Sequence, residues 1–347
     1  MKVAVVYNRD TRGVINVLGI QSREWYPEDT ISKVVHALAK ADHQVEAFAF
    51  DRYLLSKLKK FLPKLSKRQA PGIVFNLALG AQGKSRYSQL PALLELAGIP
   101  YTGSSPTGHL LSLDKVVAKQ IFMASGIPTP NYRVFTNPDQ SAQHLQHPLI
   151  VKPRGEAASL GLEIVNDDQA LKEAVRVVLD DFKQPALVEE FIEGREVNVS
   201  VIGNENPRPL PVLELVLPDS EKAILTNEDK FHRTNRKITK ICPAELPSET
   251  AAYIQKVAVQ AFMALNIFDY GRVDIRLDKY HQPHVLEMNS MASLNPTSSF
   301  VQAAKKGGLS YNQLVNKILQ VAIERYALEE PEIFGLRNKH LQSAPRV

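Results

Sequence analysis

The stretch that most constrains the fold is residues 271–295, where two runs of alternating apolar and polar residues flank a short polar segment. The runs cover residues 273–277 and 285–289, and residues 278–283 between them are rich in turn formers. Alternation on both sides of a polar turn is typical of a β-hairpin. We therefore expect two paired strands late in the chain.

The polar positions of this hairpin carry an unusual set of side chains. Asp274, Glu287 and Asn289 can project from one face, because side chains two residues apart on a strand share a face. Two carboxylates and an amide beside Arg272 suit Mg²⁺ that is bound jointly with phosphate oxygens. Taken alone, the same spacing is more often a half-exposed hairpin with solvated charges. The rest of the sequence has to decide between these interpretations.

Composition argues against several classes of protein. The 347 residues suffice for two or three lobes, and 44% hydrophobic with 23% charged residues is ordinary for a soluble globular protein. No stretch approaches the roughly 18 apolar residues of a membrane span, and the opening apolar run is too short for a secretory signal. The single cysteine, Cys242, supports neither a disulfide nor a zinc cluster. We therefore expect a cytoplasmic protein with no membrane partner.

The charge balance gives no support for nucleic-acid binding. The formal net charge is only +5, and the basic stretch at residues 57–68 is better explained as a solvated helix-and-loop surface. No nucleic-acid partner is expected.

Short apolar runs alternate with helical patterns through residues 1–113, which predicts a parallel sheet with helices on its faces. Ligands of such sheets bind beyond the carboxyl ends of the strands. There the glycine-containing segment 76–86 supplies Lys84 and Arg86, two candidates for holding a substrate carboxylate. A flexible surface loop explains this segment equally well.

Two segments in the middle of the chain fit nucleotide binding. A strand at residues 149–152 ends at Lys152 and enters the small-residue loop 154–161, where backbone N–H groups could approach phosphates. A second strand ends in Glu189 and Glu190, where a backbone edge could meet adenine, and Glu196 follows near enough to accept from ribose hydroxyls. Each glutamate also fits a solvent-facing strand position.

Several separated segments, taken in order, resemble the D-alanine–D-alanine ligase branch of the ATP-grasp superfamily. The resemblance covers residues 70–325 and is densest in LELAGIPYTGS, SLDK, IVKP, VEEFIEGRE and GRVD…LEMN, at residues 94–104, 112–115, 150–153, 188–196 and 271–289. It implies an α/β, three-lobed ATP-grasp fold, in which a parallel α/β pre-ATP-grasp domain precedes two α+β lobes that sandwich ATP. The corresponding divisions are 1–113, 114–188 and 189–328, followed by a tail at 329–347.

The same resemblance assigns roles to individual residues. The implied ATP-binding residues are Lys115, Lys152, Ser159, Glu189, Glu190, Phe191, Ile192, Glu196 and Lys230. The implied ligands of two Mg²⁺ ions, with Mn²⁺ as an alternative, are Asp274, Glu287 and Asn289. The implied catalytic residues are Arg272, which stabilises the intermediates, Lys230 on a mobile loop at 226–239, and Ser298, which meets the second substrate's carboxylate.

The activity that follows is ATP-dependent joining of a small-molecule carboxylate to an amine. Phosphoryl transfer makes the carboxylate an acyl phosphate, and it depends on positioning and on charge neutralisation. The amine then attacks where a preorganised cation such as Arg272 can stabilise the developing oxyanion. The family resemblance also implies a homodimer.

Departures from the family pattern lie in the first-substrate pocket. The lid serine and the mobile-loop tyrosine of the family, which bond with an N-terminal glutamate, are replaced by Ala158 and Phe231. Glu24 and Glu28 are both candidates for that glutamate. We therefore expect a first substrate other than D-alanine, in a pocket formed by Lys84, Arg86, Phe231 and Ser293.

Three other functions stay open at this point. The chain could be a genuine D-alanine–D-alanine or D-alanine–D-lactate ligase, or a non-catalytic ATP-binding module. It could also be an acyl-CoA-type ligase, although His281 and His284 are better explained as turn and strand-face residues than as a phosphohistidine.

Overall fold

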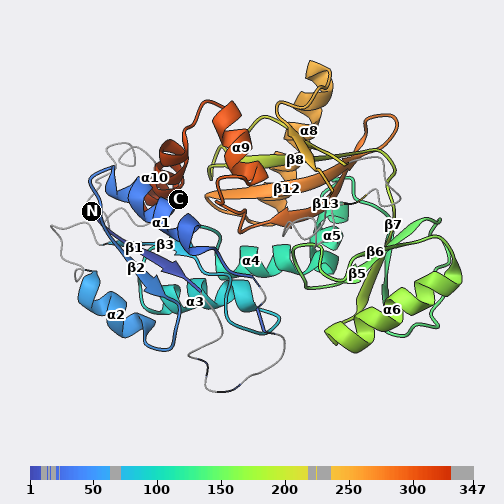
Figure 1. The fold of residues 1–347 in the computed structure, drawn as a ribbon, viewed down its shortest axis with the longest axis horizontal. Coiled ribbons are helices and arrows are strands. Elements are labelled where there is room, and N and C mark those ends of the chain that lie inside the picture. The colour runs from blue at the N-terminus through green and yellow to red at the C-terminus, as the bar shows by residue number, and fades with distance from the viewer. Residues whose placement is uncertain are drawn as a thin grey trace, which may run out of the picture.

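Three β-sheets organise the fold, and the chain builds them largely one after another (Figure 1). The structure is a computed structural model, and it describes residues 1–8, 14, 16, 21–22, 24–62, 72–217, 224 and 236–329. No helix in these ranges is long and apolar enough to cross a membrane.

The first sheet has three parallel strands in the order β2-β1-β3, namely β1 (Lys2–Tyr7), β2 (Gln44–Ala49) and β3 (Ile73–Leu77). Helix α1 (Glu28–Ala39) covers one face, and α2 (Leu54–Phe61) and α3 (Gln89–Leu96) cover the other. Coverage on both faces explains why β1 and β3 are almost continuously apolar. The expected parallel sheet is confirmed.

Two consecutive helices lead out of this sheet. Helix α4 (Pro106–Leu113) begins after Ser105, whose hydroxyl accepts from Gly108 N, and α5 (Lys115–Ala124) begins after Asp114. The first residue of α4 is a proline. Proline is well tolerated there, since the first N–H of a helix has no intrahelical partner.

The second sheet is antiparallel, in the order β4-β7-β5-β6. Its strands are β4 (Tyr132–Phe135), β5 (Leu149–Pro153), β6 (Glu163–Val165) and β7 (Ala186–Glu190). Helix α6 (Asp168–Phe182) packs its apolar side on one face. The opposite face is left to line a pocket.

The third sheet has the order β11-β10-β8-β12-β13, with β9 pairing to β8. Its strands are β8 (Arg195–Ile202), β9 (Arg208–Pro209), β10 (Leu213–Val216), β11 (Thr239–Ile241), β12 (Tyr270–Leu277) and β13 (Pro283–Asn289). Helix α8 (Ser248–Ala264) packs on this sheet. The expected hairpin is β12–β13, in which Arg272 lies opposite Asn289 and Asp274 opposite Glu287.

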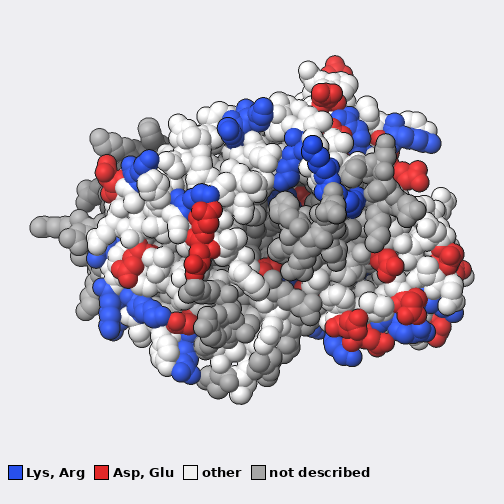
Figure 2. Space-filling view, in the orientation of Figure 1, with Lys and Arg blue, Asp and Glu red and all other residues white. Residues whose placement is uncertain are grey.

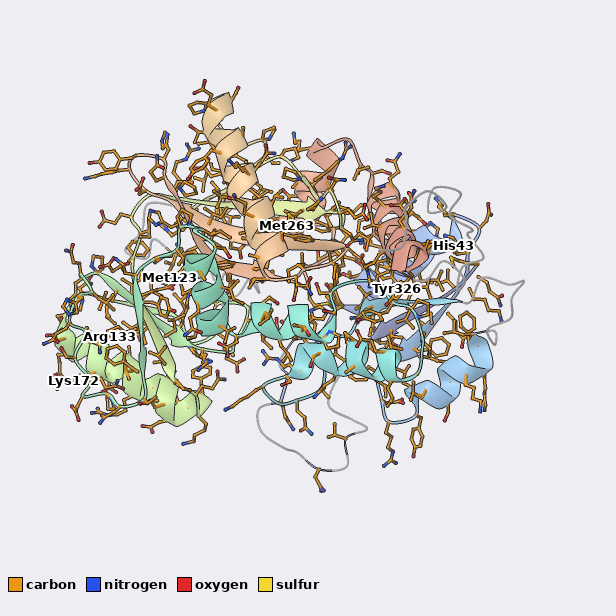
Figure 3. The ribbon with its side chains drawn as sticks, turned by 180° about the vertical axis from the view of Figure 1, so that it is seen from behind. His43, Met123, Arg133, Lys172, Met263 and Tyr326 are labelled. Carbon is orange, nitrogen blue, oxygen red and sulfur yellow. The ribbon has the colours of Figure 1, made fainter. Side chains whose placement is uncertain are left out.

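The last two helices return to the first sheet. Helix α9 (Ser299–Lys306) leads to α10 (Tyr311–Glu329), and α10 packs against α1 in a core shared with β1 and β3. Tyr326, labelled in Figure 3, makes an edge-to-face contact with Tyr101 at 6.1 Å between ring centroids. The two ends of the described chain thus share one core.

Charges are mixed on the face of the molecule seen in Figure 2. Lys and Arg side chains are interspersed with Asp and Glu side chains there. This distribution agrees with the modest net charge of +5.

Candidate active site

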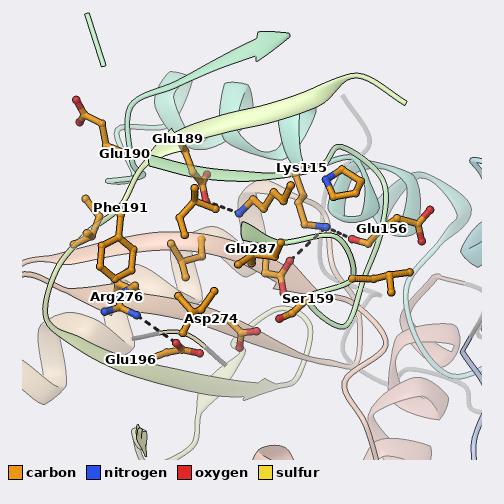
Figure 4. Close-up of a pocket in the computed structure, with 18 residues that line it drawn as sticks. Lys115, Glu156, Ser159, Glu189, Glu190, Phe191, Glu196, Asp274, Arg276 and Glu287 are labelled. Atoms are coloured by element: carbon orange, nitrogen blue, oxygen red, sulfur yellow. Dashed lines mark hydrogen bonds and ion pairs between the residues drawn. The ribbon is translucent and has the colours of Figure 1, made fainter. Parts of the chain in front are cut away.

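A pocket lies between the second and third sheets (Figure 4). Strands β5 and β7 and the start of α5 form one wall, and β12 and β13 form the other. Ten of the residues expected at the site line it: Lys115, Lys152, Ser159, Glu189, Glu190, Phe191, Ile192, Glu196, Asp274 and Glu287. Four segments that are far apart in sequence therefore converge on one cavity.

Glu189 lies between two buried lysines on the wall that β5, β7 and α5 form. It forms ion pairs with Lys152 of β5 and with Lys119 of α5, the latter at 2.9 Å. Burial alone would raise the pKa of Glu189, but the two ammonium groups outweigh it and hold that pKa below its ordinary value. Burial lowers the pKa of Lys119 to about 8, against the opposing attraction of Glu189.

The sequence did not indicate Lys119. Its hydrogen bond to Thr129 Oγ1 (2.7 Å) and its complete burial place it behind the pocket wall. The available signal was its position four residues after Lys115, which puts both lysines on one side of α5.

Lys115 connects the start of α5 to both walls of the pocket. Its ammonium donates to Glu156 O and lies 3.5 Å from Glu287 Oε2 (Figure 4). Burial lowers the pKa of Lys115, and Glu287 opposes that shift. The preceding Asp114 caps α5 by accepting from Val116 N (3.1 Å) and Val117 N (3.2 Å).

Residues 154–161, here called the phosphate loop, follow β5 and bend over the pocket. Ala158 and Ser159 both have φ of 55°, in the left-handed region that residues other than glycine rarely adopt. Gly161 (φ 70°) follows, and an added Cβ there would lie 2.6 Å from the Phe182 ring. These backbone angles turn the loop so that Ser159 lines the cavity.

The acidic residues of the hairpin gather on one face of β12 and β13. Arg272 forms two bonds with Asp274, from Nε to Oδ1 (2.6 Å) and from Nη2 to Oδ2 (2.7 Å). Asn289 Nδ2 donates to Asp274 Oδ2 (2.9 Å), and Glu287 pairs with Asp274 across the strands. Two carboxylates and an amide are hard oxygen donors of the kind that Mg²⁺ takes, so the donor set fits that ion.

The remaining ligands of such an ion have to come from elsewhere. Within the described ranges, no group of three or more His, Cys, Asp or Glu side chains is placed to hold a metal. The hairpin therefore fits an ion that shares its coordination with phosphate oxygens and water.

Arg276 lines the pocket and is, after Lys119, the second residue of the site that the sequence did not single out. Its Nη1 lies 3.4 Å from Glu196 Oε2, Nη2 donates to Gly194 O (3.0 Å), and its guanidinium lies over the Phe191 ring at 4.6 Å. Alternation along β12 puts Arg276 on the same face as Asp274. That alternation was the signal that could have found it.

Several expected site residues lie outside the pocket lining. Ser298 Oγ donates to Ser293 O (2.6 Å) and caps α9 by accepting from Val301 N (3.4 Å). Lys84 is exposed, and Arg86 is buried at 3% exposure beside the phosphate loop. Lys230 and Phe231 lie outside the described residues.

The structure separates the two candidates for the N-terminal glutamate. Glu24 is partly buried, accepts from the Tyr87 hydroxyl (2.7 Å) and lies 3.7 Å from Arg86 Nη2. Glu28 is exposed at the start of α1. Only Glu24 thus faces the side of the phosphate loop.

Comparison with known sequences gives a consistent set of relatives. The family model "D-ala D-ala ligase C-terminus" matches residues 121–320. An uncharacterised protein of Sinorhizobium fredii, y4sG, is 42% identical over 94% of this chain and 98% of its own length. The D-alanine–D-alanine ligase of Carboxydothermus hydrogenoformans is 34% identical over 88% of this chain and 96% of its own length.

Solved structures of similar fold agree with these relatives. The D-alanine–D-alanine ligase of Bacillus anthracis, crystallised with ATP, superposes with a TM-score of 0.72 at 21% identity, covering 95% of this chain and 99% of that chain. The VanG D-Ala:D-Ser ligase of Enterococcus faecalis superposes with a TM-score of 0.70 at 22% identity, covering 92% and 99%. At these identities the likeness establishes the fold.

Proposed function

The chain belongs to the D-alanine–D-alanine ligase family, and on this premise we propose that it joins a carboxylate to an amine through an acyl phosphate, using a first substrate other than D-alanine. The family makes it an ATP-dependent ligase that forms a C–N bond. Its parallel sheet and two antiparallel sheets form the expected three-lobed ATP-grasp fold.

The pocket between the two antiparallel sheets is the observation that carries the proposal. We assign the adenine to the segment 190–192, the ribose to Glu196 and the phosphates to Lys115, Lys152 and the phosphate loop. The supporting fact is convergence, because these residues come from separate segments and all line one cavity.

Asp274, Glu287 and Asn289 would hold the magnesium ions. When bound, Mg²⁺ would neutralise phosphate charge and orient the γ-phosphate for transfer. Arg272 already forms two bonds with Asp274, so its guanidinium is held beside the carboxylates, where it can stabilise negative charge that develops on the substrate. This placement suits the chemistry of acyl transfer better than nucleotide binding alone.

The altered first-substrate pocket is the finer part of the proposal. Ala158 cannot donate the hydrogen bond that a serine would, and Glu24 is instead bound by Tyr87 and faces Arg86. A substrate at Glu24 therefore meets a different set of partners from the one that the family pattern implies. The homodimer and the cytoplasmic location expected above belong to the same proposal.

The test is ADP release with Mg²⁺-ATP across a matrix of D- and L-amino acids, followed by mass spectrometry of each active mixture. We expect ADP release and a condensed product with an amino acid other than D-alanine in the first position. Glu287→Gln serves as the control for contaminating ATPases, because it removes a proposed metal ligand from a partly exposed position. We expect it to lower the rate at least about a hundredfold, which corresponds to about 3 kcal/mol of transition-state stabilisation.

Each outcome separates the proposal from its alternatives. A D-alanine dimer as the preferred product would show that Ala158 and Phe231 are tolerated variations in a D-alanine–D-alanine ligase. Condensed product that still forms at the wild-type rate in Glu287→Gln would contradict the metal assignment. Nucleotide binding without ADP release under any condition would favour a non-catalytic ATP-binding module.

A further inference from the structure

Arg86 connects three parts of the molecule that are far apart in sequence. It lies in the short turn Arg86–Ser88 after β3, and its side chain is buried. Its Nη1 donates to Gly155 O (3.2 Å), while Nη2 lies 3.5 Å from Glu156 Oε2 and 3.7 Å from Glu24 Oε2. One guanidinium is therefore shared between a carboxylate of the phosphate loop and a carboxylate near the start of the chain.

Other hydrogen bonds hold both carboxylates in place. Glu156 Oε1 accepts from Gln184 Nε2 (2.7 Å), and Glu24 Oε2 accepts from the Tyr87 hydroxyl (2.7 Å). Glu156 also lines the ATP pocket, and its backbone oxygen accepts from the Lys115 ammonium. A shift of Arg86 towards or away from Glu156 is thus transmitted to the residues that face the phosphates.

The backbone of Arg86 is fixed, but its guanidinium is not fully bonded. Gly80, at φ 79°, passes so close that an added Cβ would lie 1.9 Å from Arg86 O. Among the described residues, the buried Nε of Arg86 has no hydrogen-bond partner. The guanidinium therefore lies between two carboxylates at nearly equal distances, 3.5 and 3.7 Å, on a main chain that Gly80 packs closely against.

Resting on the proposed function, we propose that Arg86 is a positioning residue that couples the first-substrate pocket to the phosphate loop. A donor group of the first substrate that binds Glu24 competes with Arg86 for that carboxylate. The guanidinium then binds Glu156 more strongly and stabilises the loop over the nucleotide. By linkage, nucleotide under the loop raises the affinity for the first substrate by the same factor.

The test compares two nucleotides that differ in their phosphates. Calorimetric titration with AMP-PNP and MgCl₂ reports on the phosphate loop, and titration with AMP reports on the adenine and ribose contacts. The variants are Arg86→Met, Arg86→Lys and Glu24→Gln. Arg176→Met, an arginine exposed on α6, is the matched control.

We expect Arg86→Met to weaken AMP-PNP binding by about tenfold, the scale of one charged hydrogen bond, and to leave AMP binding unchanged. Arg86→Lys should restore part of the loss, because it keeps the charge but not the two-sided geometry. Glu24→Gln should leave AMP-PNP affinity equal or higher, since the guanidinium is no longer shared. Arg176→Met should change neither affinity.

Equal AMP-PNP affinity in wild type and Arg86→Met would overturn the coupling. A parallel loss of AMP affinity would give Arg86 a purely structural role and overturn it as well. Weaker AMP-PNP binding in Glu24→Gln would contradict the sharing of the guanidinium. A wild-type protein that does not bind AMP-PNP would contradict the proposed function itself, before any variant is compared.

Discussion

At the scale of single residues, the charge on Glu189 is neutralised by two buried ammonium groups that lie in different places relative to the pocket. Lys152 lines the pocket that we propose for ATP, whereas Lys119 lies behind the pocket wall and bonds to Thr129. If Lys152 is to meet phosphate, Lys119 has to keep neutralising Glu189 after Lys152 has moved. An unpaired buried carboxylate would otherwise cost several kcal/mol.

The pH dependence of ATP binding tests whether Lys119 neutralises Glu189 while Lys152 contacts phosphate. Because the pKa of Lys119 is about 8, its side chain loses its charge above that pH. Of the two lysines beside Glu189, Lys152 then carries the charge that neutralises the carboxylate. We expect the KM for ATP to rise severalfold between about pH 7 and about pH 9, as Lys152 is held away from the phosphates. Steady-state ADP release at saturating second substrate measures it.

Two variants of Lys119 complete this experiment. Lys119→Met should show a raised KM for ATP at every pH, because the neutralising charge is missing throughout. Lys119→Arg, which stays charged, should keep the KM low across the range. An unchanged pH profile in Lys119→Met would assign the wild-type effect to another group.

The residues at the site could be predicted from sequence as far as local periodicity reaches. Alternation along the hairpin was enough to put Asp274, Glu287 and Asn289 on one face, and they lie there. The ion-pair partners of Lys119 and Arg276 come from other segments, brought near only by the packing of α5 and of β8. No pattern within one element contains that information.

At the scale of elements, helix α5 is held at its first turn by a single carboxylate. Asp114 accepts from two backbone N–H groups of α5 and also forms two bonds with Arg154 Nε, at 2.8 and 2.9 Å. The same side chain thus fixes the start of the helix that carries Lys115 and the first residue of the phosphate loop.

Two substitutions of Asp114 separate these contributions. Asp114→Ala should lower the free energy of unfolding by about 1–2 kcal/mol, the usual value of a lost cap, and should raise the KM for ATP. Asp114→Asn keeps a capping oxygen but loses the charge, so we expect a smaller loss of stability with a similar effect on KM. Urea unfolding and ADP release measure the two effects. Equal stability of the alanine variant and the wild type would refute the capping role.

The segment between β7 and β8 depends on a glycine. Gly194 has φ of 137°, and an added Cβ would lie 2.0 Å from Leu277 O, a backbone atom that cannot move aside cheaply. We expect Gly194→Ala to destabilise the protein by about 2–4 kcal/mol and to weaken AMP binding, because the segment carries the proposed adenine contacts. Thermal unfolding and calorimetry test this.

Gly98→Ala is the matched control for that substitution. Gly98 also has a positive φ, 64°, but an added Cβ there would meet nothing within 4 Å. The backbone strain alone should cost about 1 kcal/mol and leave AMP binding unchanged. If both variants lose the same stability, the contact with Leu277 is not the cause.

Elements with a strong period could be predicted, and short ones could not. Strands such as β1, β3 and β5 and the hairpin β12–β13 were found because apolar residues repeat along them. Strands β9, β10 and β11 have two to four residues each and were not indicated. So short a run shows no period. Strands β9 and β10 exist because β8 offers them an edge, and β11 pairs in turn with β10.

At the scale of the whole molecule, one buried ion pair joins the first domain to the C-terminal part of the chain. Arg325 of α10 forms an ion pair with Asp269 at 3.1 Å and donates to Tyr101 O (2.9 Å). Asp269 also accepts from Gly103 N (2.7 Å) and Asn204 Nδ2 (3.0 Å). The pair therefore joins the end of the first domain, the start of β12 and the last helix.

Breaking this ion pair should lower the free energy of unfolding of the protein. We expect Arg325→Met to lower the free energy of unfolding by about 3–5 kcal/mol, because Asp269 is left charged and completely buried. The double variant Arg325→Met with Asp269→Asn should be less destabilised than the sum of the single variants, since no unpaired charge remains. Guanidinium unfolding of all four proteins measures the coupling, and strict additivity would contradict it.

The packing of α10 against α1 has a consequence for how the protein is made. On the ribosome, β1, β2 and β3 emerge early, while the helix that completes their core is synthesised after every other described element. The apolar surface that α1, β1 and β3 together present to α10 therefore stays incompletely covered for most of translation. The nascent chain has to keep that surface from aggregating until α10 has been synthesised. The first domain therefore begins to fold first and is also the last to be completed.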